Sequence, residues 1–251
     1  MLYLPAVAAR DEIIEYLDDL LDAASFEDYG PNGLQVPGAA EVSVVVTGVS
    51  AHLELFTRAA SLRAQMVLCH HGMFWRKQPL GVDERRKARL KALFDADISL
   101  AAYHLPLDAH PEVGNNALIL RELGFERGER FGDVGWTGAG AVGRGELVER
   151  CRRLFGQEPV VFADGPDEVR SIGVVSGGGA FALAEAVDRG LDAMISGEPS
   201  EPAMADAQEA GITFIAGGHY ATETFGVRRL GDLLTERFGI EHRFVEVPNP
   251  V

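Results

Sequence analysis

Histidines and carboxylates follow the buried strands of the expected sheet, at or near the points where those strands end. They are His70 and His71 after QMVLC, His104 and Asp108 after ISLAAY, and His219 and Glu223 after TFIAGG. Ligands of open α/β sheets bind outside the carboxyl ends of the strands, so side chains at these positions can converge. Imidazole and carboxylate groups together suit Zn, Mn, Fe or Ni better than Ca or Mg. The pattern predicts a site for divalent transition metal ions, although each residue taken singly is more often an ordinary polar group.

The number and spacing of these residues favour two ions rather than one. Five of these six residues would already exceed by one or two what a single catalytic zinc ion takes from protein, and one carboxylate can bridge two ions ~3.5–4 Å apart. His70 and His71 point to opposite sides of an extended strand, so they face one ion only if Gly72 lets the chain turn. Otherwise each serves a different ion, or one positions the other. His219 and Glu223 are four residues apart and share one face of a helix that begins near His219.

The elements that must position these residues alternate between strand and helix, which predicts an α/β fold with a largely parallel sheet. In the first half we expect helices over 11–24, 53–62, 83–95 and 115–123, strands over 43–51, 65–70 and 98–104, and a loop over 31–38. In the second half we expect strands over 134–142, 159–163, 171–176, 193–196 and 213–216, helices over 146–155, 181–189, 202–210 and 222–238, and an edge strand over 242–247. The halves share this rhythm without a residue-level repeat, so a duplication stays open.

The composition excludes several function classes. The chain has 251 residues and a net charge of −15, which argues against a nucleic-acid partner and against adsorption to anionic membranes. A small anionic substrate stays open, because one local cationic site can override the global charge. The one basic cluster, DERRKARLK (83–91), is expected to be a solvated helix face. Two cysteines, no signal peptide and no long apolar run predict a cytoplasmic protein without a membrane span.

Six motifs surround the candidate residues. They are NGLQV (32–36), HHGMFW (70–75), AYHLPLDAHPEVGNNAL (102–118), SGGG (176–179), ISGE (195–198) and GGHYATETFGVRRL (217–230). Together they resemble the GTP cyclohydrolase 1 type 2 family, also called the NIF-three-like family, over about residues 30–230. The chain departs from the family pattern at Leu105, where the family has Thr, and near Ser50, where the family often has an acid.

We expect two similar α/β domains, 1–125 and 126–251, and the resemblance implies a dinuclear metal site between them. The implied ligands are His70, His71 and Asp108 from the first domain and His219 and Glu223 from the second. Whether the last strand, about 240–248, returns to the first domain stays open. The resemblance also implies a toroidal homohexamer and two divalent ions per chain, with the choice among Zn, Mn, Fe and Ni unspecified.

Two functions follow as hypotheses. The first is a dinuclear metal-dependent hydrolase in which metal-activated water attacks a nucleotide-like small molecule, similar to GTP if the family name applies. His104 is the candidate general acid or base, because it adjoins a ligand motif yet is not needed for the metal. The second hypothesis is a non-enzymatic metal-binding or scaffold protein with the same site.

Other candidate sites carry weaker signals. The turn at 176–179 either holds phosphate through its N–H groups or is a tight turn that needs small residues. Arg228 and this turn are the only sequence hints of a triphosphate site. Cys69 is expected to be inert packing, and Ser176 and Ser196 lack the sequence context of a serine hydrolase.

Overall fold

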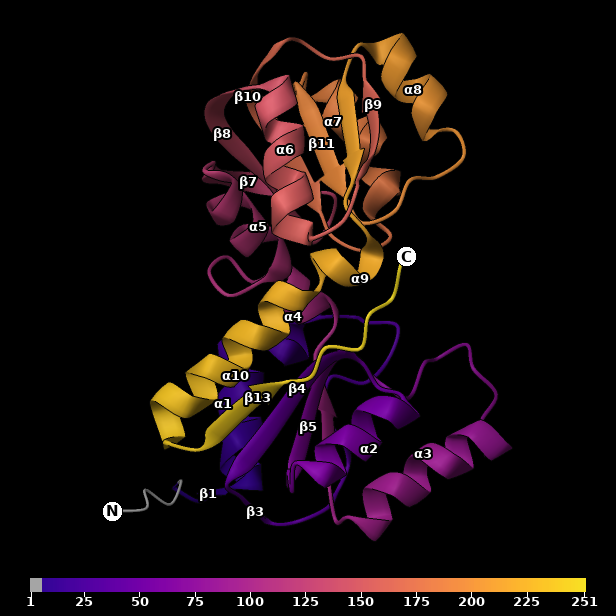
Figure 1. Cartoon of the computed structure of the whole chain (residues 1–251), viewed down its shortest axis with the longest axis vertical. Helices are drawn as coiled ribbons and strands as arrows, with labels where there is room; N and C mark the ends of the chain where they lie inside the picture. Colours follow the sequence, from indigo (N-terminus) through magenta and orange to yellow (C-terminus); the bar gives the residue numbers. More distant parts are fainter. Residues whose placement is uncertain (1–5) are drawn as a thin grey trace. The chain divides into compact units, whose positions relative to one another are not determined.

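The computed structural model describes residues 6–251, which form two compact units (Figure 1). Unit 1 comprises the chain up to Leu107 together with Gly226–Val247, and unit 2 comprises Asp108–Phe225 and Pro248–Val251. The sequence predicts domains over 1–125 and 126–251 and leaves open a return of the last strand to the first domain. The chain instead leaves unit 1 after Leu107 and returns at Gly226, so Asp108 belongs to unit 2.

Unit 1 contains a five-stranded sheet in the order β13-β4-β5-β6-β2. Its strands are β2 (Gly33–Val36), β4 (Val44–Ser50), β5 (Met66–His71), β6 (Ser99–Ala102) and β13 (Glu241–Phe244). The pairs from β13 through β6 are parallel, and β2 pairs antiparallel with β6. β4 and β5 are almost entirely buried, as expected for parallel strands covered on both faces. A separate two-stranded ribbon pairs β1 (Ala8–Ala9) with β3 (Glu41–Val42).

Four helices accompany this sheet. They are α1 (Arg10–Leu21), α2 (Leu53–Ser61), α3 (Glu84–Asp95) and most of α10 (Thr224–Phe238), with a 3-10 helix at Ala23–Ser25. Asp83 directly precedes α3, and its carboxylate accepts the Arg86 N–H and so caps the first turn. In Figure 1 the yellow α10 and β13 lie among the indigo and purple elements of unit 1, because β13 pairs with β4. β13 therefore adds the last strand to a sheet whose other four strands come from the first half of the chain.

Unit 2 contains a six-stranded sheet in the order β7-β8-β10-β11-β12-β9. Its strands are β7 (Glu126–Phe131), β8 (Gly135–Gly143), β9 (Val160–Ala163), β10 (Glu168–Val175), β11 (Ala193–Ser196) and β12 (Thr213–Ala216). Only β10, β11 and β12 are parallel to one another; β7, β8 and β9 pair antiparallel. The expectation of a largely parallel sheet is wrong for this unit, because β7 and β8 form a hairpin across the positive-φ residues Gly132 and Asp133.

The helices of unit 2 are α5 (Asn115–Leu123), α6 (Arg144–Phe155), α7 (Leu183–Asp188), α8 (Ala203–Ala210) and α9 (His219–Thr222), with a 3-10 helix at Gly179–Ala182. The short helix α4 (Leu105–Ala109) contains the point where the chain passes from unit 1 to unit 2. α5 ends at Gly124, which adopts the left-handed conformation with φ +83°. This confirms the helix stop expected at that glycine.

Three expectations about elements need correction. The loop expected over 31–38 contains β2, because Gly33–Val36 pairs with β6 at the edge of the sheet. The charged segment Glu126–Phe131 is the edge strand β7, which periodicity did not predict. The helix expected over 222–238 begins at Thr224 as α10, and a separate short helix, α9, precedes it, with Glu223 at the junction. Within residues 6–251, no helix combines the length and apolar character needed to cross a bilayer.

Candidate metal centre

Three histidines converge at the carboxyl ends of β5 and β6 in unit 1. The ring centroids of His70 and His71 lie 4.7 Å apart, and that of His104 lies 5.0 Å from the first and 5.6 Å from the second. One ligand atom from each ring lies within 4.8 Å of the others, so the three imidazoles can share a metal ion. From the sequence we expect His70 and His71 to be ligands and His104 to be an acid or base. The distances between the rings allow all three to be ligands.

The rings of the two consecutive histidines lie close together without a left-handed conformation at Gly72. Both belong to β5, and Gly72 does not adopt a positive φ. A Cβ on Gly72 would instead lie 2.1 Å from Gln35 Nε2. The Gln35 side chain accepts the Met73 N–H at 2.8 Å and donates to Pro31 O at 2.8 Å. Gly72 therefore leaves space for the side chain of Gln35, whose hydrogen bond to Met73 links β2 to the end of β5.

Each histidine of this cluster has its Nδ1 hydrogen-bonded to an oxygen within unit 1. His70 Nδ1 lies 3.1 Å from Tyr103 O, His104 Nδ1 lies 2.7 Å from Asp28 Oδ1, and His71 Nδ1 lies 3.1 Å from Ser50 Oγ. A carbonyl and a carboxylate only accept, so Nδ1 of His70 and His104 carries the hydrogen. The ring lone pair is then on Nε2, which is the usual arrangement of a metal-binding imidazole oriented by its other nitrogen.

Asp28 holds His104 in this orientation. Its buried carboxylate accepts hydrogen bonds from His104 Nδ1, from Asn32 Nδ2 at 3.0 Å, and from the N–H groups of Tyr29 at 2.6 Å and Leu105 at 2.9 Å. Burial raises the pKa of Asp28, but these partners outweigh it and lower the pKa to about 2. The carboxylate is therefore charged at neutral pH and fixes one tautomer of His104.

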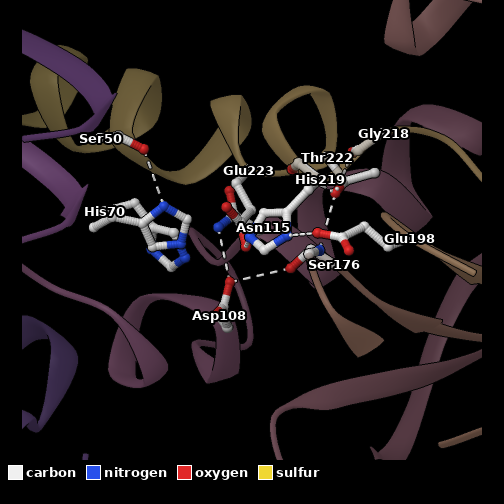
Figure 2. Close-up of polar contacts among 12 residues, drawn as sticks. Ser50, His70, Asp108, Asn115, Ser176, Glu198, Gly218, His219, Thr222 and Glu223 are labelled. Atoms are coloured by element: carbon white, nitrogen blue, oxygen red, sulfur yellow. Dashed lines mark hydrogen bonds and ion pairs between the residues drawn. The ribbon is translucent and has the colours of Figure 1, made fainter. Parts of the chain in front are cut away.

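His219 and Glu223, the two predicted ligands after β12, lie beside each other in unit 2. His219 Nε2 lies 3.2 Å from Glu223 Oε1, and Glu223 is 3% exposed. His219 Nδ1 donates a hydrogen bond to Glu198, as Figure 2 shows. Burial lowers the pKa of His219, but the two carboxylates outweigh it and raise the pKa to about 9. Two carboxylates around one imidazole favour positive charge at this position, whether a proton on His219 or a metal ion in its place.

The glycine turn after β10 packs directly against this pair. A Cβ on Gly177 would lie 2.1 Å from Glu223 Oε1 and 3.2 Å from His219 Nε2, and Gly177 has φ +59°. Its N–H donates to Thr222 Oγ1 at 3.0 Å, and its carbonyl accepts from the Glu198 N–H at 3.0 Å. Of the two alternatives for the turn at 176–179, this geometry favours the tight turn, because the Gly177 N–H is already engaged.

Asp108 is fixed by a separate network within unit 2. Its Oδ1 accepts from Asn115 Nδ2 at 2.8 Å and from Ser176 Oγ at 3.1 Å, as Figure 2 shows. Asn116 Nδ2 donates to the Asp108 carbonyl at 3.2 Å, and Asn116 Oδ1 accepts the Ser176 N–H at 2.7 Å. Ser176 therefore orients a carboxylate, which agrees with the expectation that it is no hydrolase nucleophile.

Several residues of these networks were not predicted from the sequence. They are Asp28, Ser50, Asn115, Asn116 and Glu198, which orient the predicted residues. The rule that found the ligands also reaches Glu198, since it follows β11 by two residues. Asp28 had no such signal, because it lies in a loop before β2 whose position depends on tertiary pairing.

Cys69 and Trp75 border the unit 1 cluster without ligand character. Cys69 is fully buried in β5, and burial raises the pKa of its thiol well above the ordinary value. This agrees with the expectation of inert packing. The Trp75 ring lies 5.2 Å from the His104 ring and 6.0 Å from the His71 ring, so it forms a wall beside the imidazoles.

The donor atoms fit a divalent transition metal. Unit 1 offers imidazole nitrogens with Nδ1 already engaged, and unit 2 offers an imidazole with carboxylates. Such a mixed nitrogen and oxygen set suits Zn, Mn, Fe or Ni, and the oxygen partners of Nδ1 match the way metal-binding histidines are commonly held. Both observations support the prediction of a metal site on the sequence-predicted residues.

The chain matches the Duf34/NIF3 (NGG1p interacting factor 3) family over residues 8–250. It is 42% identical over 249 residues to a Pseudomonas aeruginosa protein called GTP cyclohydrolase 1 type 2 homolog, covering 96% of this chain and 98% of the relative. Among solved structures, TTHA1606 from Thermus thermophilus is similar with a TM-score of 0.92 and 36% identity, covering 97% of this chain and 100% of that one. Protein ybgI, described as of unknown function, is similar with a TM-score of 0.94, 36% identity and the same coverage.

Proposed function

Because this chain belongs to the Duf34/NIF3 family, we propose that it is a metal-dependent hydrolase with two divalent ions per chain. The proposed ligands are His70, His71, Asp108, His219 and Glu223. The observation that carries the proposal is that all four strand-exit histidines have Nδ1 hydrogen-bonded to an oxygen. This is the usual arrangement of an imidazole that binds a metal ion through Nε2. Unit 1 contains two of the five proposed ligands and unit 2 contains three.

The chain's own residues divide the proposed work. Divalent ions supply Lewis-acid chemistry, which activates water and polarises the electrophilic centre of a substrate. His104 accepts or donates a proton at Nε2, while Asp28 holds its Nδ1–H. Trp75 lines a narrow pocket together with His70 and His104 and limits the approach of bulk water.

The substrate we propose is a small, nucleotide-like molecule. The support is the name of the Pseudomonas aeruginosa relative, which refers to GTP, together with the family resemblance of the motifs. The chain has a net charge of −15. Metal ions bound at the ends of the strands would offset negative charge there and so favour an anionic substrate.

A nucleotide-hydrolysis screen on the purified, metal-analysed protein tests this proposal. The informative variant is His104→Asn, which keeps a donor for Asp28 and removes Nε2. We expect turnover to fall about 10²–10⁴-fold while the metal content is unchanged. His110→Asn is the matched control, because it makes the same substitution outside the cluster and keeps an acceptor for the N–H groups of Glu112 and Val113.

The other outcomes separate the alternatives. A loss of metal from His104→Asn would make His104 a ligand and end its role as acid or base. If the wild type holds its metal but turns over no nucleotide, the non-enzymatic metal-binding or scaffold function is favoured instead. We also propose a homohexamer, from the resemblance alone; light scattering should then give six times the 27.1 kDa of one chain.

A further inference from the structure

A strongly basic segment follows the double histidine in an otherwise acidic chain. Residues 76–91 hold seven of the 23 Lys and Arg residues and only two of the 38 acids. The cations are Arg76, Lys77, Arg85, Arg86, Lys87, Arg89 and Lys91. They lie in the loop after β5 and along α3, within unit 1. A cation on a merely solvated helix face needs no further partner, whereas a half-buried cation without an ion pair favours an anionic ligand.

Apart from Lys77, which is exposed, these cations divide into two groups by their partners. Arg76, Arg85, Lys87 and Lys91 each form an ion pair with a nearby carboxylate. Arg86 instead donates to Pro79 O at 2.8 Å, Gly81 O at 2.7 Å and Gln78 Oε1 at 3.1 Å, none of them charged. Arg89 has no carboxylate partner within ion-pair distance among residues 6–251, and both arginines are half-buried. Half-buried positive charge without a counter-charge favours an anion from outside the chain.

The two uncompensated arginines line one pocket. Its volume is about 370 Å³, which falls in the usual range of small-molecule sites. The lining includes Met73, Gln78, Pro79, Arg85, Arg86 and Arg89. The single carboxylate in the lining, that of Asp83, is engaged by the Arg86 N–H and the Arg85 guanidinium. The pocket therefore presents an excess of positive charge and preformed guanidinium donors.

The pocket lies next to the histidine cluster along the chain. Met73, in its wall, follows His71 by two residues, and two residues of chain span at most about 7 Å. The Arg86 guanidinium lies over the Phe74 ring at 5.9 Å, and the next residue, Trp75, lies against His104. The segment from His70 to Trp75 thus begins with two proposed ligands and contributes Met73 to the wall of the basic pocket.

We propose that this pocket binds the phosphate chain of a small-molecule ligand, a di- or triphosphate. The inference rests on the proposed function, for which it names the phosphate-binding part of the substrate site. Guanidinium groups pair with phosphate oxygens through directed, charge-assisted hydrogen bonds. The two sequence hints for such a role are otherwise occupied: Arg228 stacks on the Phe244 ring at 3.5 Å, and the Gly177 N–H bonds to Thr222.

Calorimetric titration with inorganic tripolyphosphate tests the pocket in the protein as purified. Arg89→Gln should weaken binding about tenfold, because it removes a charged hydrogen-bond donor. Lys91→Gln is the matched control: it removes one positive charge from the same helix, outside the pocket, and should change Kd by less than about twofold. Arg85→Gln, a second substitution in the lining, should also weaken binding, and thermal melts check that each variant is folded.

The outcomes are separable from those of the metal centre. The Arg89→Gln effect should persist in a His71→Ala background, whether or not that variant has lost metal. Equal losses for Arg89→Gln and Lys91→Gln, or no loss for Arg89→Gln in a folded protein, would overturn the proposal. A single-stranded oligonucleotide that binds more tightly than tripolyphosphate and depends on Arg89 would also overturn it, since the pocket would then serve a nucleic acid.

Discussion

At the scale of single residues, the orientation of the imidazoles matters as much as their number. His70, His71, His104 and His219 each have Nδ1 bound by an oxygen, and two of these oxygens belong to carboxylates. A carboxylate on Nδ1–H fixes the tautomer and increases the basicity of Nε2 toward a metal. The oxygens that hold the rings therefore belong to the site as much as the proposed ligands do.

Glu198→Gln tests this view without touching a ligand. The substitution keeps the size of the side chain but removes the charge beside His219 Nδ1. We expect metal affinity to fall about 10–100-fold, measured by competition with a chromophoric chelator. Glu201→Gln, at an exposed position just before α8, is the matched control and should leave affinity unchanged. Equal affinities for the two variants would refute a role of Glu198 in holding His219.

Gly177→Ala tests the packing of the turn against the proposed ligands. The new Cβ would lie 2.1 Å from Glu223 Oε1, at a φ of +59° that an L-residue adopts with strain. We expect a loss of about 1–3 kcal/mol in unfolding free energy and a reduced metal content. The neighbouring Gly178→Ala is the control, because φ is −77° and, among the described residues, no heavy atom lies within 4 Å of its Cβ position. Similar losses in both variants would contradict the specific role of Gly177.

At the scale of elements, continuous apolar runs predicted strands well and edge strands poorly. β4, β5 and β12 fall within one or two residues of the expected ranges, because each is buried and rich in apolar side chains. β2 and β7 were not expected. The first is short and bounded by Pro and Gly, and the second reads ERGERF, whose side chains are mostly exposed. Such strands are fixed by the neighbour they pair with, which local sequence does not reveal.

The same distinction holds for the candidate site. Residues at strand exits were predictable, because the end of a buried strand is visible in the sequence. Asp28 and Asn115 were not, since one lies before an unpredicted strand and the other begins a helix instead of following a strand. Their roles depend on hydrogen bonds to His104 and Asp108 that only the folded chain brings about.

The strand β13 supplies a prediction on pH. His242 Nε2 lies 2.8 Å from Thr47 Oγ1 on β4, and its Nδ1 lies 3.1 Å from Asp232 on α10. Burial lowers the pKa of His242; Asp232 acts to raise it and Arg228 to lower it further. The unfolded chain then binds a proton near pH 6.5 that the folded chain resists, so stability is full above this pH and declines as the pH falls below it.

The measurement is the unfolding free energy by urea at several pH values, for wild type and His242→Gln. The difference between the two proteins should shrink as the pH is lowered below 6.5, because only the wild type loses this contribution. A constant difference from pH 8 down to about pH 5 would show that His242 titrates as it does in the unfolded chain.

At the scale of the whole molecule, the chain returns to its first unit after completing the second. Nothing local in the sequence marks this return, because α10 reads as one more amphipathic helix and β13 as one more edge strand. The return places Asp108 with His219 and Glu223 in unit 2, while His70 and His71 stay in unit 1. Under the proposed function, a bound metal should stabilise the folded chain.

Metal removal tests this consequence. A ligand that binds only the folded state stabilises it by about 2.7 kcal/mol at a hundred times its Kd. For a chain of this size, that corresponds to a rise in Tm of roughly 5–10 °C. Dialysis against a chelator should lower Tm by about this amount, and added Zn or Mn should restore it. An unchanged Tm after complete removal would contradict the coupling of metal binding to the fold.

The central proposal is that His70, His71, Asp108, His219 and Glu223 bind two metal ions per chain. The most direct test is the metal content per chain, measured by mass spectrometry on wild type, His71→Ala and Glu223→Gln, all purified without chelators. We expect two transition metal ions per wild-type chain and a lower content in each variant. A wild type without transition metal, or a folded variant with an undiminished content, would contradict it.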